Sequence, residues 1–268
     1  MLYHAEFATV KLAESDMEYI RFGNGHKILI MLPGLGDSLR SMKGMALPMA
    51  VMYRAFTADF TVYVFSRKDT LPEGYSTRDM ARDQAEAMEK LGIEKADIFG
   101  VSMGGMIAQH LAIEYPQRVG KLILAVTSSR PNPILIESVE EWIALARAGD
   151  HTAFMNSNLL RIYSENYCRK NRWMVPILGR LTKPKSYDRF FVQAYACLAH
   201  NAFDDLHRIT APTLIIGGEK DVTLGGEASR EIAEAIPAAG LKMYPQWGHG
   251  VYEEAKDFNS LVIDFINK

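Results

Sequence analysis

Cysteine, surplus charge and long apolar runs are all scarce in this sequence. The 268 residues include only two cysteines, Cys168 and Cys197, and these form no C-x-x-C pair, so we expect buried or inert thiols rather than a disulfide framework. Lys and Arg number 30 against 32 for Asp and Glu, which leaves no basic excess for binding nucleic acid. No apolar stretch approaches the roughly 18 residues of a membrane-spanning helix. We therefore expect neither a nucleic-acid partner nor membrane insertion.

Metal and targeting signals are missing as well. The seven histidines show no H-E-x-x-H or other ligand spacing, so no metal site is predicted. The residues after Met1 lack a positive end followed by an apolar run, which indicates no secretory signal and a cytoplasmic protein. Hydrophobic residues make up 48% and charged residues 23%, as in ordinary globular proteins. The partner to expect is a small molecule, and the oligomeric state stays open.

Short apolar runs recur along the chain with helical segments between them. Continuous apolar runs, unlike alternating ones, are typical of strands covered on both faces, as in a parallel sheet between helices. Looser runs at 7–12 and 17–22 predict an antiparallel edge pair. Buried strands are predicted at Ile28–Leu32, Phe60–Phe65, Ala96–Val101, Leu122–Val126, Thr213–Ile216 and Leu241–Tyr244. The pattern predicts an α/β fold with a mostly parallel eight-stranded sheet flanked by helices.

One long segment departs from this alternation. Residues 128–206 show no convincing strand, only helical segments rich in aromatic side chains. We interpret it as a helical cap inserted in a core domain made of residues 1–127 and 207–268. Elsewhere the helices carry ordinary signals: Ser76 and Asp79 resemble a capping box, and an apolar stripe marks the last helix.

Ser102 stands in the pattern of a nucleophile elbow. The predicted strand ending at Val101 runs into Ser102-Met103-Gly104, and the next residues are helical in character. A G-x-S-x-G turn between strand and helix projects a serine hydroxyl above the sheet, and its glycines allow the helix to cross the strand closely. A glycine-rich turn with a surface serine is the alternative, although the glycine spacing of nucleotide-binding loops is absent.

A serine hydroxyl needs a general base and a group that orients this base. His249 follows the last predicted strand, and Asp221 follows the strand Thr213–Ile216. A solvated histidine, an aspartate that bonds its own turn, or competition from Glu219 are the alternatives. The order serine, acid, histidine, each at the end of a strand, predicts a catalytic triad of Ser102, Asp221 and His249.

An oxyanion hole is predicted from two backbone N–H groups. One belongs to Met103, directly after the serine, and the other to Leu35 in the loop after the strand Ile28–Leu32. The alternative for this loop is an ordinary turn capped by Asp37 or Ser38.

Four segments of the chain together resemble the α/β-hydrolase superfamily. They are Pro33–Gly36, Gly100–Gly104, Gly218–Asp221 and Gly248–His249. Members similar to this chain have a helical cap after the sixth strand, and many have His-Gly where this chain has Pro33-Gly34. Because the oxyanion donor is a backbone group, that difference concerns loop geometry more than catalysis. The resemblance implies an acyl-enzyme mechanism without a cofactor, in which His249 takes the Ser102 proton and later activates water.

Substrate choice is expected to lie in the cap. Its aromatic side chains could line an apolar pocket or form the cap's own core, and the candidates for the pocket are Trp142, Phe154, Tyr163 and Phe191. A small ester is the leading substrate class. A C–C bond hydrolase of the same fold and a ligand-binding receptor without turnover are the alternatives, because fold does not fix function. A serine at the elbow argues against resemblance to the dehalogenase branch, whose members attack with a carboxylate.

Overall fold

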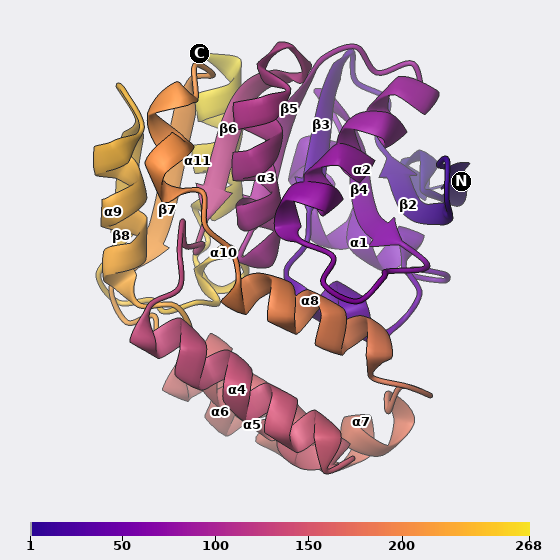
Figure 1. The fold of residues 1–268 in the computed structure, drawn as a ribbon, viewed down its shortest axis with the longest axis vertical. Helices are drawn as coiled ribbons and strands as arrows, with labels where there is room; N and C mark the ends of the chain where they lie inside the picture. Colours follow the sequence, from indigo (N-terminus) through magenta and orange to yellow (C-terminus); the bar gives the residue numbers. More distant parts are fainter. Residues whose placement is uncertain (1) are drawn as a thin grey trace.

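The computed structural model describes residues 2–268 and contains one eight-stranded sheet covered by helices on both faces (Figure 1). The strand order is β1-β2-β4-β3-β5-β6-β7-β8. The first two strands form an antiparallel pair, β2 also runs antiparallel to β4, and all other neighbours are parallel. The predicted α/β architecture and the antiparallel edge pair are thus confirmed. The strands are β1 (Glu6–Lys11), β2 (Asp16–Phe22), β3 (Lys27–Leu32), β4 (Phe60–Lys68), β5 (Ala96–Val101), β6 (Val119–Ala125), β7 (Thr213–Gly218) and β8 (Gly240–Tyr244).

The central strands are buried on both faces. In β3, Ile30 and Leu32 belong to the hydrophobic cluster that contains side chains of α2 and α3, whereas Leu29 and Met31 belong to the cluster on the other face, with side chains of α1 and α11. This explains why the sequence shows continuous apolar runs here. The strand β8 is different: it pairs only with β7, and Leu241 is 40% exposed. The strand predicted at Leu241–Tyr244 is present, but the prediction that it is buried was wrong, because an edge strand leaves part of its surface to solvent.

Helix ends follow their local signals. The Ser76 hydroxyl accepts from the Asp79 N–H and the Asp79 carboxylate accepts from the Ser76 N–H, which confirms the capping box at the start of α2. The helices are α1 (Ala46–Met52), α2 (Thr77–Lys90), α3 (Met103–Glu114), α4 (Pro133–Arg147), α5 (His151–Ile162), α6 (Glu165–Asn171), α7 (Val175–Leu181), α8 (Asp188–Leu198), α9 (Gly226–Ala235), α10 (Val251–Glu254) and α11 (Phe258–Asn267). Shorter 3-10 segments are η1 (Leu2–His4), η2 (Leu35–Leu39), η3 (Arg54–Phe56), η4 (Pro116–Arg118), η5 (Arg172–Met174) and η6 (Phe203–Arg208).

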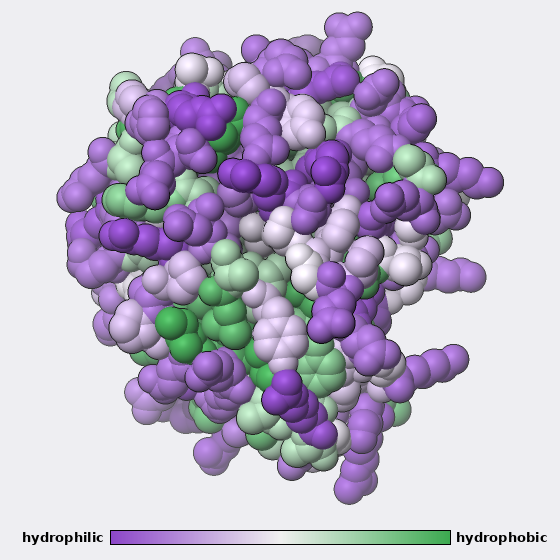
Figure 2. Space-filling model, in the orientation of Figure 1, coloured by the Kyte–Doolittle hydropathy of each residue, from purple (hydrophilic) through white to green (hydrophobic). Residues whose placement is uncertain are grey.

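Five helices, α4 to α8, lie between β6 and β7 in the chain. They form a layer beyond the carboxyl ends of the parallel strands, with α8 nearest the sheet and α4 to α7 farther out (Figure 1). Apolar side chains gather over α4 and α8 on the face shown in Figure 2. The exact boundaries 128 and 206 of the cap stay a prediction.

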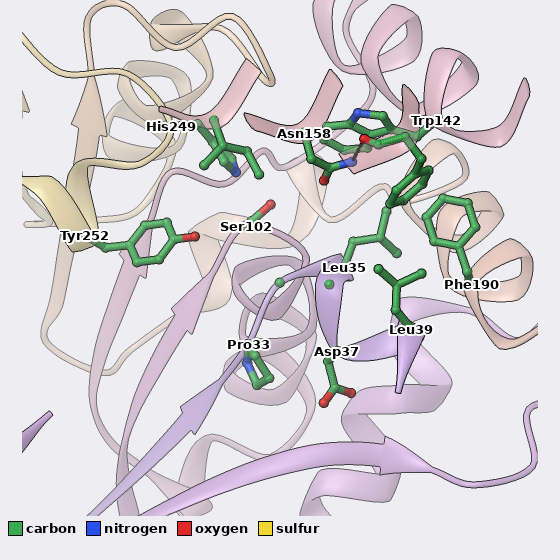
Figure 3. A pocket seen from close by; sticks show the side chains of 14 residues that line it. Pro33, Leu35, Asp37, Leu39, Ser102, Trp142, Asn158, Phe190, His249 and Tyr252 are labelled. Atoms are coloured by element: carbon green, nitrogen blue, oxygen red, sulfur yellow. Dashed lines mark hydrogen bonds between the residues drawn. The ribbon is translucent and has the colours of Figure 1, made fainter. Parts of the chain in front are cut away.

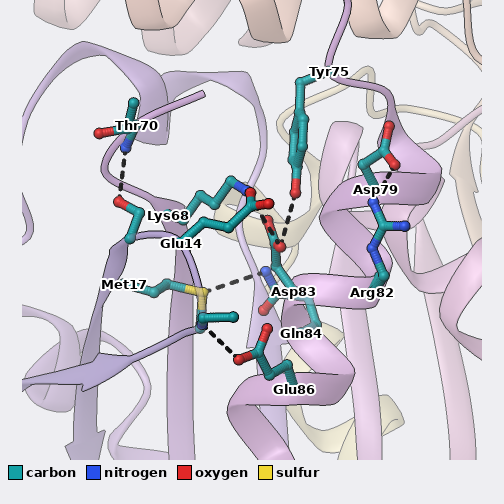
Figure 4. A network of polar contacts seen from close by, with 12 residues as sticks. Glu14, Met17, Lys68, Thr70, Tyr75, Asp79, Arg82, Asp83, Gln84 and Glu86 are labelled. Carbon is teal, nitrogen blue, oxygen red and sulfur yellow. Dashed lines mark hydrogen bonds and ion pairs between the residues drawn. The ribbon is translucent and has the colours of Figure 1, made fainter. Parts of the chain in front are cut away.

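Polar side chains tie the end of β4 to α2. Lys68 lies 3.0 Å from a carboxylate oxygen of Glu14 and 3.9 Å from Asp83, and its ammonium group stands 4.2 Å from the ring centre of Tyr75 (Figure 4). The Tyr75 hydroxyl donates to Asp83 over 2.8 Å. These contacts fix the carboxyl end of β4, where Ser66, Arg67 and Lys68 are all buried. The same strand end supports the candidate site.

Candidate active site

Ser102 lies on a strained turn between β5 and α3. Its backbone has φ 54° and ψ −121°, a region that residues with a side chain seldom occupy and that is typical of functional turns. A Cβ at Gly104 would stand 1.9 Å from the Leu32 carbonyl oxygen, and one at Gly100 would stand 2.6 Å from the Gly104 oxygen. Only glycine fits at these two crossings, as expected where a helix returns closely over its strand.

Asp221 and His249 are brought together from two neighbouring loops. His249 Nδ1 lies 2.8 Å from Asp221 Oδ2, while Asp221 Oδ1 accepts from the N–H groups of Thr223 and Leu224. Both side chains are buried. The carboxylate is thus fully occupied in holding the imidazole and its own turn. Glu219, the possible competitor, instead pairs with Arg230 at the surface.

The loops that carry this pair pack against each other without side chains between them. A Cβ at Gly218 would lie 2.4 Å from the Gly248 carbonyl oxygen, and one at Gly248 would lie 2.8 Å from that of Lys220. Glycine at these positions therefore lets the loop after β7 and the loop after β8 approach closely enough for the hydrogen bond between Asp221 and His249.

Ser102 and His249 open into one cavity of about 200 Å³ beneath the cap (Figure 3). No hydrogen bond joins their side chains within residues 2–268. The loop before η2 lies beside the serine, because a Cβ at Gly34 would stand 3.3 Å from Ser102 Cβ. The cavity is lined by Pro33, Gly34, Leu35, Gly36, Asp37, Leu39, Ser102, Trp142, Phe154, Asn158, Ile162, Phe190, His249 and Tyr252.

The two predicted oxyanion donors begin helical segments. Leu35 is the first residue of η2 and Met103 the first residue of α3. The first N–H groups of a helix have no acceptor within that helix and carry partial positive charge, so both amides suit a developing anion. Leu35 lines the cavity, whereas the Met103 side chain is buried in the core below it.

The loop that carries Leu35 is held by buried charges. Arg67 Nη2 donates to the Pro33 carbonyl oxygen over 2.6 Å, and Arg67 Nη1 lies 3.6 Å from Asp37. Arg189 of α8 donates to the Asp37 carbonyl oxygen over 3.1 Å and to Ser66 Oγ over 3.0 Å. Burial lowers the pKa of the Arg67 guanidinium, and the charge of Asp37 opposes this effect. Hence an ion cluster shared by core and cap fixes the loop. The sequence alone suggests only a turn capped by Asp37 or Ser38 as the alternative.

The four pocket candidates divide into two groups. Trp142 and Phe154 line the cavity, whereas Tyr163 and Phe191 do not. The Tyr163 hydroxyl donates to Glu253 over 2.8 Å and its ring stacks on Tyr167, with ring centres 4.2 Å apart. Phe191 packs on its neighbour Phe190, which does reach the cavity.

Five cavity residues were missed from the sequence, namely Leu39, Asn158, Ile162, Phe190 and Tyr252, and three of them had a local signal. Asn158 stands one helical turn after Phe154 on α5 and shares its face. Phe190 precedes Phe191 on α8, and Tyr252 is the second residue of helix α10, three residues after His249. Burial raises the pKa of the Tyr252 hydroxyl well above its ordinary value, so this group keeps its proton.

The part of the chain that the structure describes contains neither a cluster of metal-ligand side chains nor a helix of membrane-spanning character. No group of three or more His, Cys, Asp or Glu side chains in residues 2–268 is arranged to hold a metal ion. Among the same residues, no helix has the length and apolar character that crossing a bilayer demands.

Comparison with known proteins assigns the family. The sequence model of the alpha/beta hydrolase fold family matches residues 27–256. A relative from Caulobacter sp. (strain K31), named "Putative carbamate hydrolase RutD", is 26% identical over 81% of this chain and 85% of its own length. The crystal structure of MGS-M2, an alpha/beta hydrolase enzyme from a Medee basin deep-sea metagenome library, superposes with a TM-score of 0.86 at 24% identity, covering 97% of this chain and 98% of that one. The enol-lactonase from Burkholderia xenovorans LB400 superposes with a TM-score of 0.82 at 20% identity, covering 97% and 100%. With its elbow, its paired loops and a family match across most of its length, the chain belongs to the alpha/beta hydrolase fold family.

Proposed function

We propose that this protein is a serine hydrolase that cleaves a small ester-like substrate through an acyl-enzyme intermediate. One observation carries the proposal: Ser102, on its strained turn, shares a cavity with His249, whose Nδ1 is already bonded to the buried Asp221. This arrangement leaves His249 Nε2 free to accept a proton from a nucleophile.

In the proposed mechanism Ser102 Oγ attacks the substrate carbonyl carbon while His249 Nε2 takes the hydroxyl proton. The carbonyl electron pair moves to its oxygen, which the N–H groups of Leu35 and Met103 stabilise. As the tetrahedral intermediate collapses, the leaving alcohol takes the proton from His249. Water then gives a proton to His249 and its oxygen to the acyl carbon, and Ser102 is released with its proton restored.

Cavity size and the names of relatives support a small carbonyl substrate. The volume of about 200 Å³ is below the roughly 300–1,000 Å³ of drug-sized ligand sites. The Caulobacter relative is named for carbamate hydrolysis and the Burkholderia structure for an enol-lactone. Both names describe cleavage beside a carbonyl carbon, as an acyl-enzyme mechanism requires.

A panel of p-nitrophenyl esters from acetate to octanoate, run beside meta-cleavage-type diketones, tests the proposal. Because the cavity is small, we expect turnover to be fastest for the short acyl groups and to fall steeply with chain length. A fluorophosphonate probe is expected to label Ser102. Turnover of the diketones alone would favour the C–C bond hydrolase, and ligand binding without labelling of Ser102 would favour a receptor.

A further inference from the structure

The cap wall of the cavity is apolar except at one position. Its side chains come from α4, α5 and α8, and four of them, Trp142, Phe154, Ile162 and Phe190, are aromatic or aliphatic. Asn158 of α5 is the single amide among them. A polar group placed in an otherwise apolar pocket fixes the orientation of a ligand more than it adds affinity.

The orientation of this amide is set by its own helix. Asn158 Nδ2 donates to the Phe154 carbonyl oxygen over 2.9 Å, so the nitrogen faces the helix and the oxygen must face the other way. In Figure 3 the side-chain oxygen points into the cavity, toward the side where Ser102 and Leu35 lie. No residue in the range 2–268 donates to this oxygen. The cavity therefore contains a pre-oriented acceptor without a protein donor.

We propose that Asn158 determines specificity by accepting a hydrogen bond from a hydroxyl or N–H group of the substrate. The inference rests on the proposed hydrolase function and narrows its substrate class to acyl compounds that carry such a donor near the carbonyl. A substrate with an ether or alkyl group at this point would displace water from the oxygen and leave it without a donor. Sites built around a hydrogen bond reject such analogues strongly.

Two matched pairs of p-nitrophenyl esters test the inference. In each pair a methyl group replaces the donor hydrogen: 3-hydroxybutanoate against 3-methoxybutanoate, and N-acetylglycinate against N-acetylsarcosinate. We expect the donor-bearing ester of at least one pair to have a kcat/KM at least about tenfold above that of its partner, because the acceptor is then satisfied. Ratios near one for both pairs in the unmodified enzyme would overturn the inference.

Variants on α5 then test whether the ratio of the two kcat/KM values depends on the side-chain oxygen of Asn158. Asn158→Leu keeps the approximate size and removes the acceptor, so the ratio is expected to fall below about threefold, which is less than one ordinary hydrogen bond contributes. Asn158→Asp keeps an acceptor and is expected to retain the preference. Asn156→Leu is the matched control: this residue lies on the same helix but is exposed and outside the cavity, and its ratio should equal that of the unmodified enzyme.

The outcomes separate the inference from the function on which it rests. Ester hydrolysis with a donor preference that survives in Asn158→Leu, or is lost equally in Asn156→Leu, overturns the role of Asn158 and leaves the hydrolase function standing. Absence of both ester turnover and fluorophosphonate labelling at Ser102 overturns the two together. Thermal unfolding of each variant shows whether a lost preference comes from a lost fold.

Discussion

The cavity has two walls that are held in different ways. Its core wall, the loop 33–39, is fixed by buried polar contacts, with Arg67 on the Pro33 carbonyl oxygen and Asp37 between Arg67 and Arg189. Its cap wall is held largely by packing, as in the edge-to-face contact of Phe154 and Phe190, whose ring centres are 5.2 Å apart, together with one hydrogen bond from Trp142 Nε1 to Ser157 Oγ over 3.1 Å. Hydrogen bonds specify position and angle, whereas apolar packing tolerates exchange of shape. We therefore expect changes at the core wall to abolish reaction or folding and changes at the cap wall to alter substrate choice.

The largest effect is expected at the nucleophile. Ser102→Ala removes the attacking oxygen, so kcat/KM for a short p-nitrophenyl ester should fall by roughly 10⁴- to 10⁶-fold. The melting temperature should not fall, because alanine fits the same backbone turn and the substitution removes no packing contact. Steady-state kinetics of the variant measure kcat/KM, and thermal unfolding measures its melting temperature. Undiminished hydrolysis would refute the nucleophile assignment.

Next in size is the loss of the buried guanidinium of the core wall. Arg67→Met leaves the Pro33 carbonyl oxygen without its donor and Asp37 with one cation fewer, which should lower the free energy of unfolding by about 3 kcal/mol. Urea unfolding measures the change. The matched control is Arg82→Met, which breaks the ion pair with Asp79 at the surface and should cost about 0 to 1 kcal/mol. Equal losses in the two variants would show that the buried cluster does not hold the loop.

A smaller effect per residue on the free energy of unfolding is expected on acidification, and it arises where α3 packs against the end of α8. His110 and His200 lie there with ring centres 5.1 Å apart, and burial lowers their pKa values to about 4 and about 3. Unfolded histidines bind protons near their ordinary pKa of about 6.5, so the unfolded state gains protons first as pH falls. Stability is therefore complete above that value and declines toward pH 4, by about 2 kcal/mol for each histidine between pH 7 and 5.

Unfolding in urea at several pH values measures this decline, and one variant assigns it. His110→Leu removes one of the two titrating groups and should make the pH dependence shallower. His207→Leu changes an exposed histidine nearby and should leave it unaltered. An unchanged slope in His110→Leu would locate the titrating groups elsewhere.

The predicted triad positions and the cap also differ in how far the sequence predicted them. Ser102 directly follows β5, and Asp221 and His249 lie in the loops that follow β7 and β8. The parallel topology alone places such positions at one edge of the sheet. No comparable rule predicts which side chains of the cap reach the cavity. Tyr163 and Asn158 lie within one helix and its C-cap, yet which of them reaches the cavity depends on how α5 packs against α4 and α7, which periodicity does not specify. Burial at β8 likewise depended on its place at the edge of the sheet.

The smallest effect is expected where the cap wall is changed conservatively. Phe190 and Phe191 are adjacent on α8 and point about 100° apart, so only Phe190 lines the cavity. Phe190→Leu should shift the acyl-length preference of the enzyme by one or two carbons toward longer chains, because it opens space beside the substrate. The shift should be roughly a tenfold change in relative kcat/KM, at the lower end of the about 1 to 3 kcal/mol that one methylene in an apolar pocket is worth. Phe191→Leu makes the same chemical change outside the cavity, so it can lower stability but should leave the acyl-length profile unaltered. Identical profiles in the two variants would mean that the cap wall does not contact the acyl chain. Substrate choice would then have to come from the core wall, and the expectation that the cap wall determines it would be wrong.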